Sequence, residues 1–258
     1  MSRMKISKQM IKYLEDRINC ENVIKFADKH FDDNGDDDNA SIQKLIVDDV
    51  SMSFVIMDYS EKNANTFTKT KYQIYDFMTE ANYTGFEIFP YLYGVLNCHD
   101  NNNGRLYVYY EVFQNNMTKI FDNITHASDW YDIAFQMIYI NYYIRILHGY
   151  IYDGDVQNHQ YNKLDKPYYK DYEFNNTTIK VNHKYLIVLF NVEQLERISD
   201  SNAGSEKTNI DMLLQYISEN KDNIKIMPTN RIMELLNEVK ESPDNTANIL
   251  VKYYGDNK

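Results

Sequence analysis

The sequence predicts an α+β protein in which a small β-rich part precedes a mostly helical part. Short apolar and aromatic runs separated by turn signals, typical of β-strands, fill much of residues 41–113. Residues 129–150 are apolar on nearly every face, as in a helix buried within a larger domain. A chain of 258 residues can bury such a core, as one large domain or as two lobes.

Apolar residues at a helical step open the chain, so residues 1–40 are predicted to form a helical extension. Extended runs follow at 41–49 and 52–60, and a helical pattern covers 69–81. Within 89–113, two β-rich runs flank "HDNNNG", which predicts a hairpin.

The C-terminal part continues after the apolar helix with a Tyr-rich insertion. Residues 174–191 are predicted to contain two β-like runs around a turn. Two closing helices are expected in "TNIDMLLQYISEN" and "TNRIMELLNEVKES", because each is introduced by a Thr or Asn that can cap a helix N-terminus.

Charge and cysteine content exclude several classes of function. With 27 Lys and Arg against 38 Asp and Glu, the net charge of -11 disfavours binding to nucleic acid or anionic lipid. No apolar run is long enough to span a bilayer, and the charged N-terminus does not resemble a signal peptide, so a cytoplasmic location is expected. Cys20 and Cys98 are expected to be reduced, and no metal site is predicted from the cysteine and histidine spacing.

The order of these elements resembles that of a protein kinase, specifically the divergent kinase-like proteins of large DNA viruses. The resemblance covers roughly residues 40 to 220. It implies a two-lobed α+β fold, with a helical N-terminal extension at 1–40, a β-rich N-lobe at 41–113 and a mostly helical C-lobe at 114–258.

In that family, a strand of the form "FVIK" carries a lysine that neutralises the nucleotide phosphates. The corresponding run here, "SFVIMDYS", has Met57 in the lysine position, and a thioether carries no charge. The family pairs that lysine with a glutamate on the next helix. Gln73 takes the glutamate position here, with Asp76 a poorer candidate one turn later.

The segment "HGYIYDGDVQNHQY" resembles the family's catalytic loop, in either of two alignments. In the first, Asp155 is the base, Asp153 takes the histidine position and Gln160 the position of the metal-binding asparagine. In the second, Asp153 is the base and Asn158 is the metal-binding asparagine. We prefer the first, since the second puts Gly154 where the family buries an apolar side chain.

The acid that holds magnesium in the family follows a strand and begins the motif "DFG". Here "YLIVLF" runs into "NVEQ", so neutral Asn191 takes that position. Magnesium prefers charged oxygen ligands, and no stretch matches the glycine-rich loop "GxGxxG". Asp211 lies where the family's next long helix begins and would brace the catalytic loop.

These departures predict a pseudokinase, with no cofactor or metal, whose partner is a protein such as a related active kinase or its substrate. One alternative is an atypical kinase that binds ATP and magnesium, uses Asp155 or Asp153 as its base, and draws a lysine from Lys44 or Lys62. The other alternative is an α+β structural or interaction protein unrelated to kinases. If the chain is viral, its expected location is the host cytoplasm or the virion.

Overall fold

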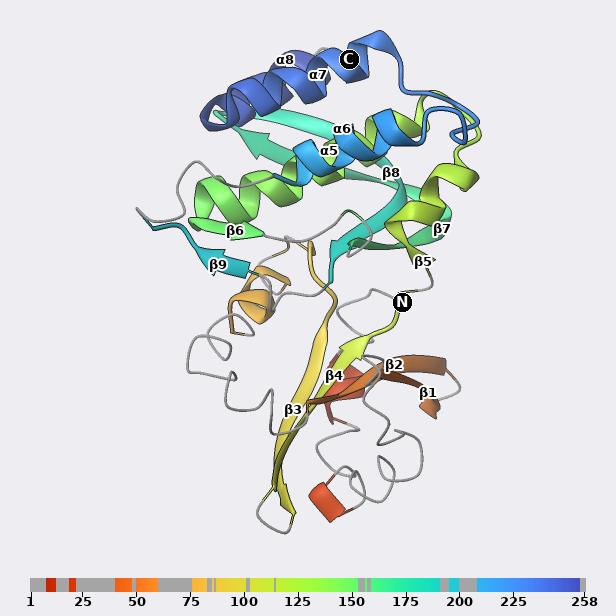
Figure 1. The fold of residues 1–258 in the computed structure, drawn as a ribbon, viewed down its shortest axis with the longest axis vertical. Helices are drawn as coiled ribbons and strands as arrows, with labels where there is room; N and C mark the ends of the chain where they lie inside the picture. Colours follow the sequence, from red (N-terminus) through yellow and green to blue (C-terminus); the bar gives the residue numbers. More distant parts are fainter. Residues whose placement is uncertain are drawn as a thin grey trace. The chain divides into compact units, whose positions relative to one another are not determined.

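In this computed structural model, the chain divides into two compact units, Met1–Val112 and Phe113–Lys258. Both units contain β-sheet, and the second also contains the long helices, so the predicted α+β class is confirmed (Figure 1). The residues that the structure describes are 8–12, 19–21, 40–47, 50–59, 76–82, 85, 87–100, 103–113, 115–152, 156, 159–190, 195–199 and 208–255.

The first unit contains a four-stranded antiparallel sheet with the strand order β1-β2-β4-β3. Its strands are β1 (Ala40–Val47), β2 (Val50–Tyr59), β3 (Leu92–Asp100) and β4 (Asn103–Glu111). β1 with β2 and β3 with β4 form hairpins, and β2 also pairs with β4. The hairpin predicted within 89–113 is therefore confirmed, and β2 is an inner strand of the sheet.

A helix at residues 76–82 separates the two hairpins in the sequence, in agreement with the predicted element order. Its last residue, Asn82, is 1% exposed, and its Nδ2 donates to the carbonyl oxygens of Phe89 and Pro90, each at 3.1 Å. Phe77 of the same helix meets the Phe89 ring edge to face. These contacts fix the helix to the segment that enters β3.

The expectation of reduced thiols was wrong, because Cys20 and Cys98 form a disulfide. The two residues are 78 positions apart in the sequence, and the fold brings their Cα atoms to 5.4 Å, within the usual range for a disulfide. Spacing along the chain could not reveal this proximity. Disulfides are rare in cytosolic proteins, so this bond does not favour the predicted cytoplasmic location.

The second unit contains a three-stranded antiparallel sheet with the order β5-β7-β8. Its strands are β5 (Asn115–Asn116), β7 (His159–Phe174) and β8 (Thr177–Leu189). β7 and β8 form a long hairpin whose turn residues, Asn175 and Asn176, both have positive φ, as a tight hairpin turn requires. The two β-like runs predicted within 174–191 are therefore one strand, and the turn precedes it.

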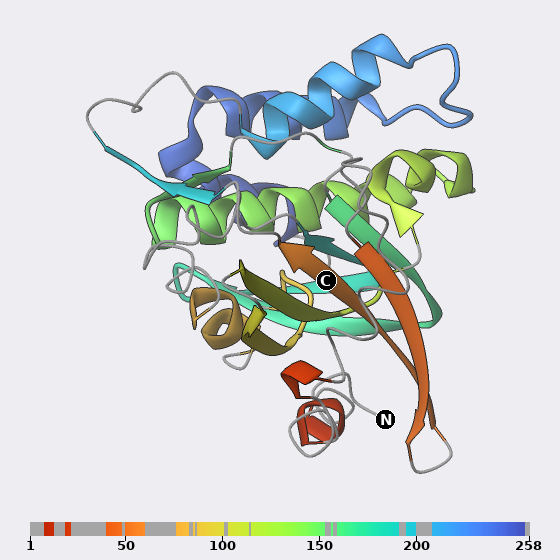
Figure 2. The same ribbon diagram turned by 60° about the horizontal axis from the view of Figure 1, so that its bottom comes forward.

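Helices cover this hairpin (Figures 1 and 2). They are α5 (Asp129–Asn141), α6 (Asn209–Glu219), α7 (Asn230–Glu241) and α8 (Thr246–Tyr254). α5 packs on β8, α6 and α7 pack on α5, and α8 contacts both strands of the hairpin. The two predicted closing helices are thus confirmed as α6 and α7, whereas α8 was not predicted.

The predicted buried helix is α5, which continues as a turn of π-helix, Tyr142–Leu147. Every residue of α5 except Tyr131 is buried. Trp130, the only tryptophan of the chain, is fully buried, and its Nε1 donates to the carbonyl oxygen of Ile226 at 2.7 Å. Its ring stacks on Phe121. Helix α5 is therefore the centre of the second unit's core.

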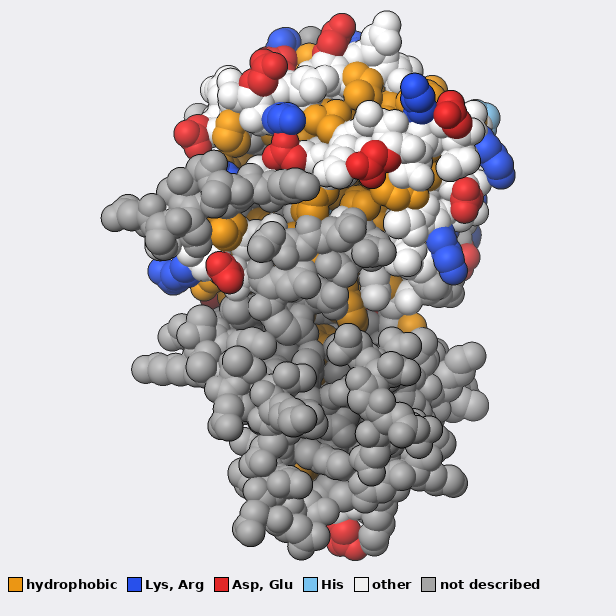
Figure 3. Space-filling view, in the orientation of Figure 1, with side chains coloured by type: hydrophobic (Ala, Val, Ile, Leu, Met, Phe, Trp, Pro, Cys, Tyr) orange, Lys and Arg blue, Asp and Glu red, His pale blue; other side chains and the backbone are white. Residues whose placement is uncertain are grey.

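The surface of the second unit carries charged side chains of both signs with apolar side chains between them (Figure 3). Exposed large apolar residues include Leu147, Ile198 and Tyr169, the last of which is 65% exposed. Of the helices that the structure describes, none is both long and apolar enough to cross a membrane.

Candidate functional site

Most of the predicted site residues lie outside the described residues: Gln73, Asp153, Asp155, Asn158 and Asn191. Met57 lies in β2, where its backbone is opposite Ala40 of β1 and Val108 of β4. Gln160 lies in β7, paired with Asn116 and Val188, and is partly buried. The roles assigned to these residues, and the alignment of the catalytic loop, therefore stay predictions.

The strands that flank the two predicted loops pair with each other, so the ends of the two loops lie close together. β6 (Tyr150–Tyr152) precedes the predicted catalytic loop, and β9 (Leu195–Arg197) follows the predicted magnesium motif. These strands pair with each other, with Tyr152 opposite Leu195. On the far side of the loops, His159 of β7 is opposite Leu189 of β8. Residues opposite each other in antiparallel strands lie about 5 Å apart, so both ends of one loop adjoin the ends of the other.

Between these anchors, the structure describes Val156, which is 1% exposed. This residue follows Asp155 directly, and the preferred alignment expects a buried apolar side chain at that position. Before β6, Gly149 has a φ of 66°, a conformation that favours glycine, and it reverses the chain after the π-helix. Its carbonyl oxygen accepts a hydrogen bond from Ile198 N, which extends the β6-β9 pairing.

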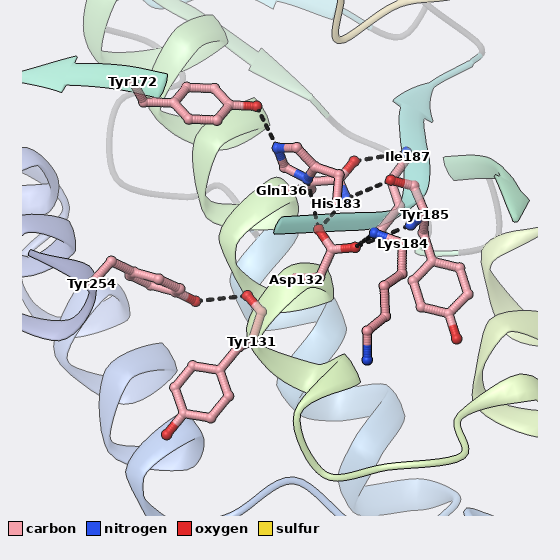
Figure 4. A network of polar contacts seen from close by, with 9 residues as sticks. All are labelled: Tyr131, Asp132, Gln136, Tyr172, His183, Lys184, Tyr185, Ile187 and Tyr254. Atoms are coloured by element: carbon pink, nitrogen blue, oxygen red, sulfur yellow. Dashed lines mark hydrogen bonds and ion pairs between the residues drawn. The ribbon is translucent and has the colours of Figure 1, made fainter. Parts of the chain in front are cut away.

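A buried polar network joins α5 to β8 (Figure 4). One oxygen of Asp132, Oδ2, accepts from the backbone nitrogens of Lys184 at 2.7 Å and Tyr185 at 3.0 Å. Gln136, one turn later, donates to the Tyr185 carbonyl oxygen and accepts from Ile187 N at 2.8 Å. β8 is an edge strand in this sheet, and the two α5 side chains bond its unpaired backbone groups.

The other oxygen of Asp132 continues the network into the hairpin. Oδ1 lies 2.7 Å from His183 Nδ1, and His183 Nε2 lies 2.8 Å from the Tyr172 hydroxyl. An ionised carboxylate only accepts, so Nδ1 carries a proton, and in a neutral imidazole Nε2 then accepts from Tyr172. All three side chains are at most 8% exposed. This arrangement holds α5, β8 and β7 in one register.

Sequence reasoning missed Asp132, Gln136 and His183. A signal was present, because Asp132 and Gln136 are polar residues spaced i, i+4 in an otherwise apolar helix, and buried polar groups need partners. That spacing does not identify β8 as the strand to which these side chains bond. The side chains of Asp132, Gln136 and His183 are each at most 7% exposed, and their bonds hold α5 against β8.

The bracing role predicted for Asp211 stays a prediction, because the catalytic loop, apart from Val156, lies outside the described residues. Its Oδ2 accepts from Thr208 N at 3.0 Å and from the Thr208 hydroxyl at 2.8 Å, while Thr208 Oγ1 accepts from Asp211 N. Its Oδ1 lies 3.0 Å from Lys240 Nζ of α7. Asp211 therefore completes a capping box at the start of α6 and links α6 to α7.

The lowered pKa values of two aspartates in the second unit predict how the stability of this unit depends on pH. Burial opposes ionisation of Asp129, but hydrogen bonds from Lys184, Thr125 N and His126 N outweigh it and lower the pKa below the usual 3.8. Burial likewise opposes ionisation of Asp211, and its bonds to Thr208 and Lys240 lower the pKa. A pKa that is lower in the folded state adds stability above pH 3.8, and this stability is lost as the pH falls through the folded value.

We therefore expect the urea midpoint of the second unit to fall as the pH is lowered from about 5 to about 2. Asp129→Asn should flatten this dependence, because the amide does not titrate. The midpoint can be followed by Trp130 fluorescence, with the exposed Asp244→Asn as a control that leaves the profile unchanged. An Asp129→Asn profile as steep as that of the wild type would contradict the assignment.

Among the described residues, no group of three or more His, Cys, Asp or Glu side chains is placed to hold a metal ion. The residues predicted to contact nucleotide or metal in the alternative function lie mainly in the two loops, outside this part of the chain.

Comparisons with known proteins found a viral protein of similar sequence and solved structures of kinases. No family model matches the chain. Two similar solved structures are both of protein kinases. One is the Cydia pomonella granulovirus kinase PK-1, with a TM-score of 0.49 and 9% identity, covering 90% of this chain and 98% of that one. The other is the PF14_0431 kinase domain, with a TM-score of 0.42 and 14% identity. That match covers 64% of this chain but only half of the length of the kinase domain.

The uncharacterised protein R691 of Acanthamoeba polyphaga mimivirus is 41% identical over 278 aligned positions. The alignment covers 99% of both chains, so the relationship extends over both units. The chain belongs to the same family as this mimivirus protein.

Proposed function

We propose that this protein is a pseudokinase, a kinase-like protein that binds another protein and does not transfer phosphate. The observation that carries the proposal is Met57. Its position lies in inner strand β2, between β1 and β4, where the kinase resemblance requires a lysine. Without a fixed cation, the charge on the α and β phosphates of a nucleotide is not neutralised there.

Two further departures support the proposal. Gln73 and Asn191 are neutral at the positions where the resemblance requires a glutamate and a magnesium-binding aspartate. Loss of the lysine together with its glutamate partner is physically consistent, because either charge left alone would be costly to bury. The retained pairing of β6 with β9 and of β7 with β8 supports a scaffold whose fold persists without the chemistry.

The proposed partner is a protein, such as a related active kinase or its substrate, and the proposed location is the cytoplasm. No nucleotide or metal is required for this role. The net charge of -11 favours a partner with a basic surface, since opposite charges steer association.

A thermal-shift titration with ATP, with and without magnesium or manganese, tests the proposal. A ligand that binds only the folded state stabilises it by about 2.7 kcal/mol at 100 times its Kd. We expect no shift at millimolar nucleotide, with an active protein kinase shifting in the same plate as the positive control.

A metal-dependent shift, together with phosphotransfer that Asp153→Ala or Asp155→Ala abolishes, would refute the proposal and establish the atypical kinase. Gln157→Ala, within the same loop but without a predicted role, is the matched control. Activity lost equally in all three variants would indicate a general disturbance of the loop rather than loss of a base.

A further inference from the structure

The first residue of α6, Asn209, has a buried polar side chain whose hydrogen-bonding atoms are not satisfied by the described part of the protein. Its side chain is 1% exposed, and neither Oδ1 nor Nδ2 has a hydrogen-bond partner among the described residues. A buried polar group without a partner keeps its desolvation cost, so such groups in folded proteins are bonded, often to an internal water.

Asn209 lines a small cavity at the junction of α5, α6 and β6. The volume open to the centre of a water-sized molecule is about 10 Å³, which is room for about one water. The other lining residues include Asn141, the last residue of α5, which is 4% exposed, and Tyr152, the last residue of β6.

The cavity is also lined by Arg145 and Tyr150, and of the two α6 residues at it, Thr208 and Asn209, only Asn209 has a side chain that the capping interactions leave available. The Thr208 hydroxyl also lines it, but this group donates to Asp211 Oδ2 and accepts from Asp211 N. The carboxylate of Asp211 already complements the helix N-terminus, so a second anion has little electrostatic reason to bind. Water can both donate to Oδ1 and accept from Nδ2, which an anion cannot.

We propose that the cavity is a binding site for one internal water, held by the amide of Asn209 and shared with that of Asn141. The water joins the end of α5 to the start of α6 beside β6, the strand that leads into the predicted catalytic loop. The site does not depend on whether the protein transfers phosphate.

A direct test uses the wild-type chain, labelled with ¹⁵N. We expect a cross-peak between the Asn209 side-chain amide protons and a long-lived water, and, in a high-resolution crystal structure, a water about 2.7–3.2 Å from the amide atoms. An amide without such a cross-peak, in a cavity without such a water, would overturn the proposal.

A stability measurement gives an independent test with a predicted sign. Asn209→Leu removes both hydrogen bonds to the water, so the equilibrium constant for folding should fall about tenfold. If the amide is instead dry and unbonded, the same change removes its burial cost and the constant rises, which would refute the proposal. Asn237→Leu, on the exposed face of α7, is the matched control and should change the constant by less than about threefold.

Two further arms identify the occupant. The double variant Asn141→Leu/Asn209→Leu should lose less stability than the sum of the single variants, because both changes remove the same water; strict additivity would contradict a shared site. Replacing chloride by gluconate should leave the melting temperature unchanged. Stabilisation that depends on chloride would show that an anion, and not water, occupies the cavity. If Asn209→Leu does not fold, the wild-type spectra and crystal structure decide.

Discussion

Asp132→Ala should destabilise the second unit by about 3–5 kcal/mol, as expected when a buried, fully bonded carboxylate is removed. The change leaves the backbone nitrogens of Lys184 and Tyr185 without their acceptor, and it also removes the partner of His183 Nδ1. These groups are sealed by the packing of α5 on β8, so each keeps most of its desolvation cost.

Trp130 makes the measurement specific, because the only tryptophan of the chain lies in the same helix as Asp132. Urea unfolding followed by its fluorescence reports on the second unit. Asp132→Asn is the graded control: its amide oxygen can still accept from Lys184 N and Tyr185 N, so its loss should be smaller.

Tyr172→Phe removes only the hydroxyl at the end of the network and should cost about 1 kcal/mol. The expected order of stability is therefore wild type, Tyr172→Phe, Asp132→Asn and Asp132→Ala. An Asp132→Ala variant as stable as Tyr172→Phe would show that the network contributes little to holding α5 on the hairpin.

Loss of the disulfide between Cys20 and Cys98 should destabilise the first unit by about 4.5 kcal/mol in the chain-entropy model, within a usual range of 2–5. The large expected effect follows from the separation of 78 residues, because a longer closed loop removes more entropy from the unfolded chain. Cys20→Ser and Cys98→Ala should each lower the melting temperature of this unit, followed by circular dichroism.

Dithiothreitol provides the matched comparison for these variants. It should shift the wild type to the variants' melting temperature and leave the variants unchanged, while the Trp130 signal of the second unit moves little. The denatured wild type should show no free thiols before reduction. Two free thiols, or a wild-type melt unaffected by dithiothreitol, would contradict the disulfide.

The sequence alone determined the elements whose periodicity reflects their own burial or termini. The helix at α5 was predictable because all but one of its residues are buried, and the starts of α6 and α7 because Thr208 and Thr229 cap them by bonds to residues three positions later. The β3-β4 hairpin was predictable from its turn residues. These signals are local, so neighbouring residues carry them.

The sequence alone also shows which residue types occupy the positions that the kinase resemblance assigns to charged groups. Met57, Gln73 and Asn191 are uncharged whatever the fold, and the element order suggested their positions. The sequence predicted a turn within 174–191 but not its position, because several Asn-containing segments there have similar turn propensity and only the pairing of β7 with β8 selects Asn175 and Asn176.

The tertiary structure alone decided which distant groups meet. Nothing local pairs Cys20 with Cys98, Asp132 with His183, or Tyr152 with Leu195, because each pair is separated by more than 40 positions in the sequence. The same limit applies to Asn209, whose character as a buried amide depends on the packing of α5, α6 and β6 around it. Patterns of residue type record the average environment of a segment, whereas partners over long separations are chosen by the packing of the whole unit.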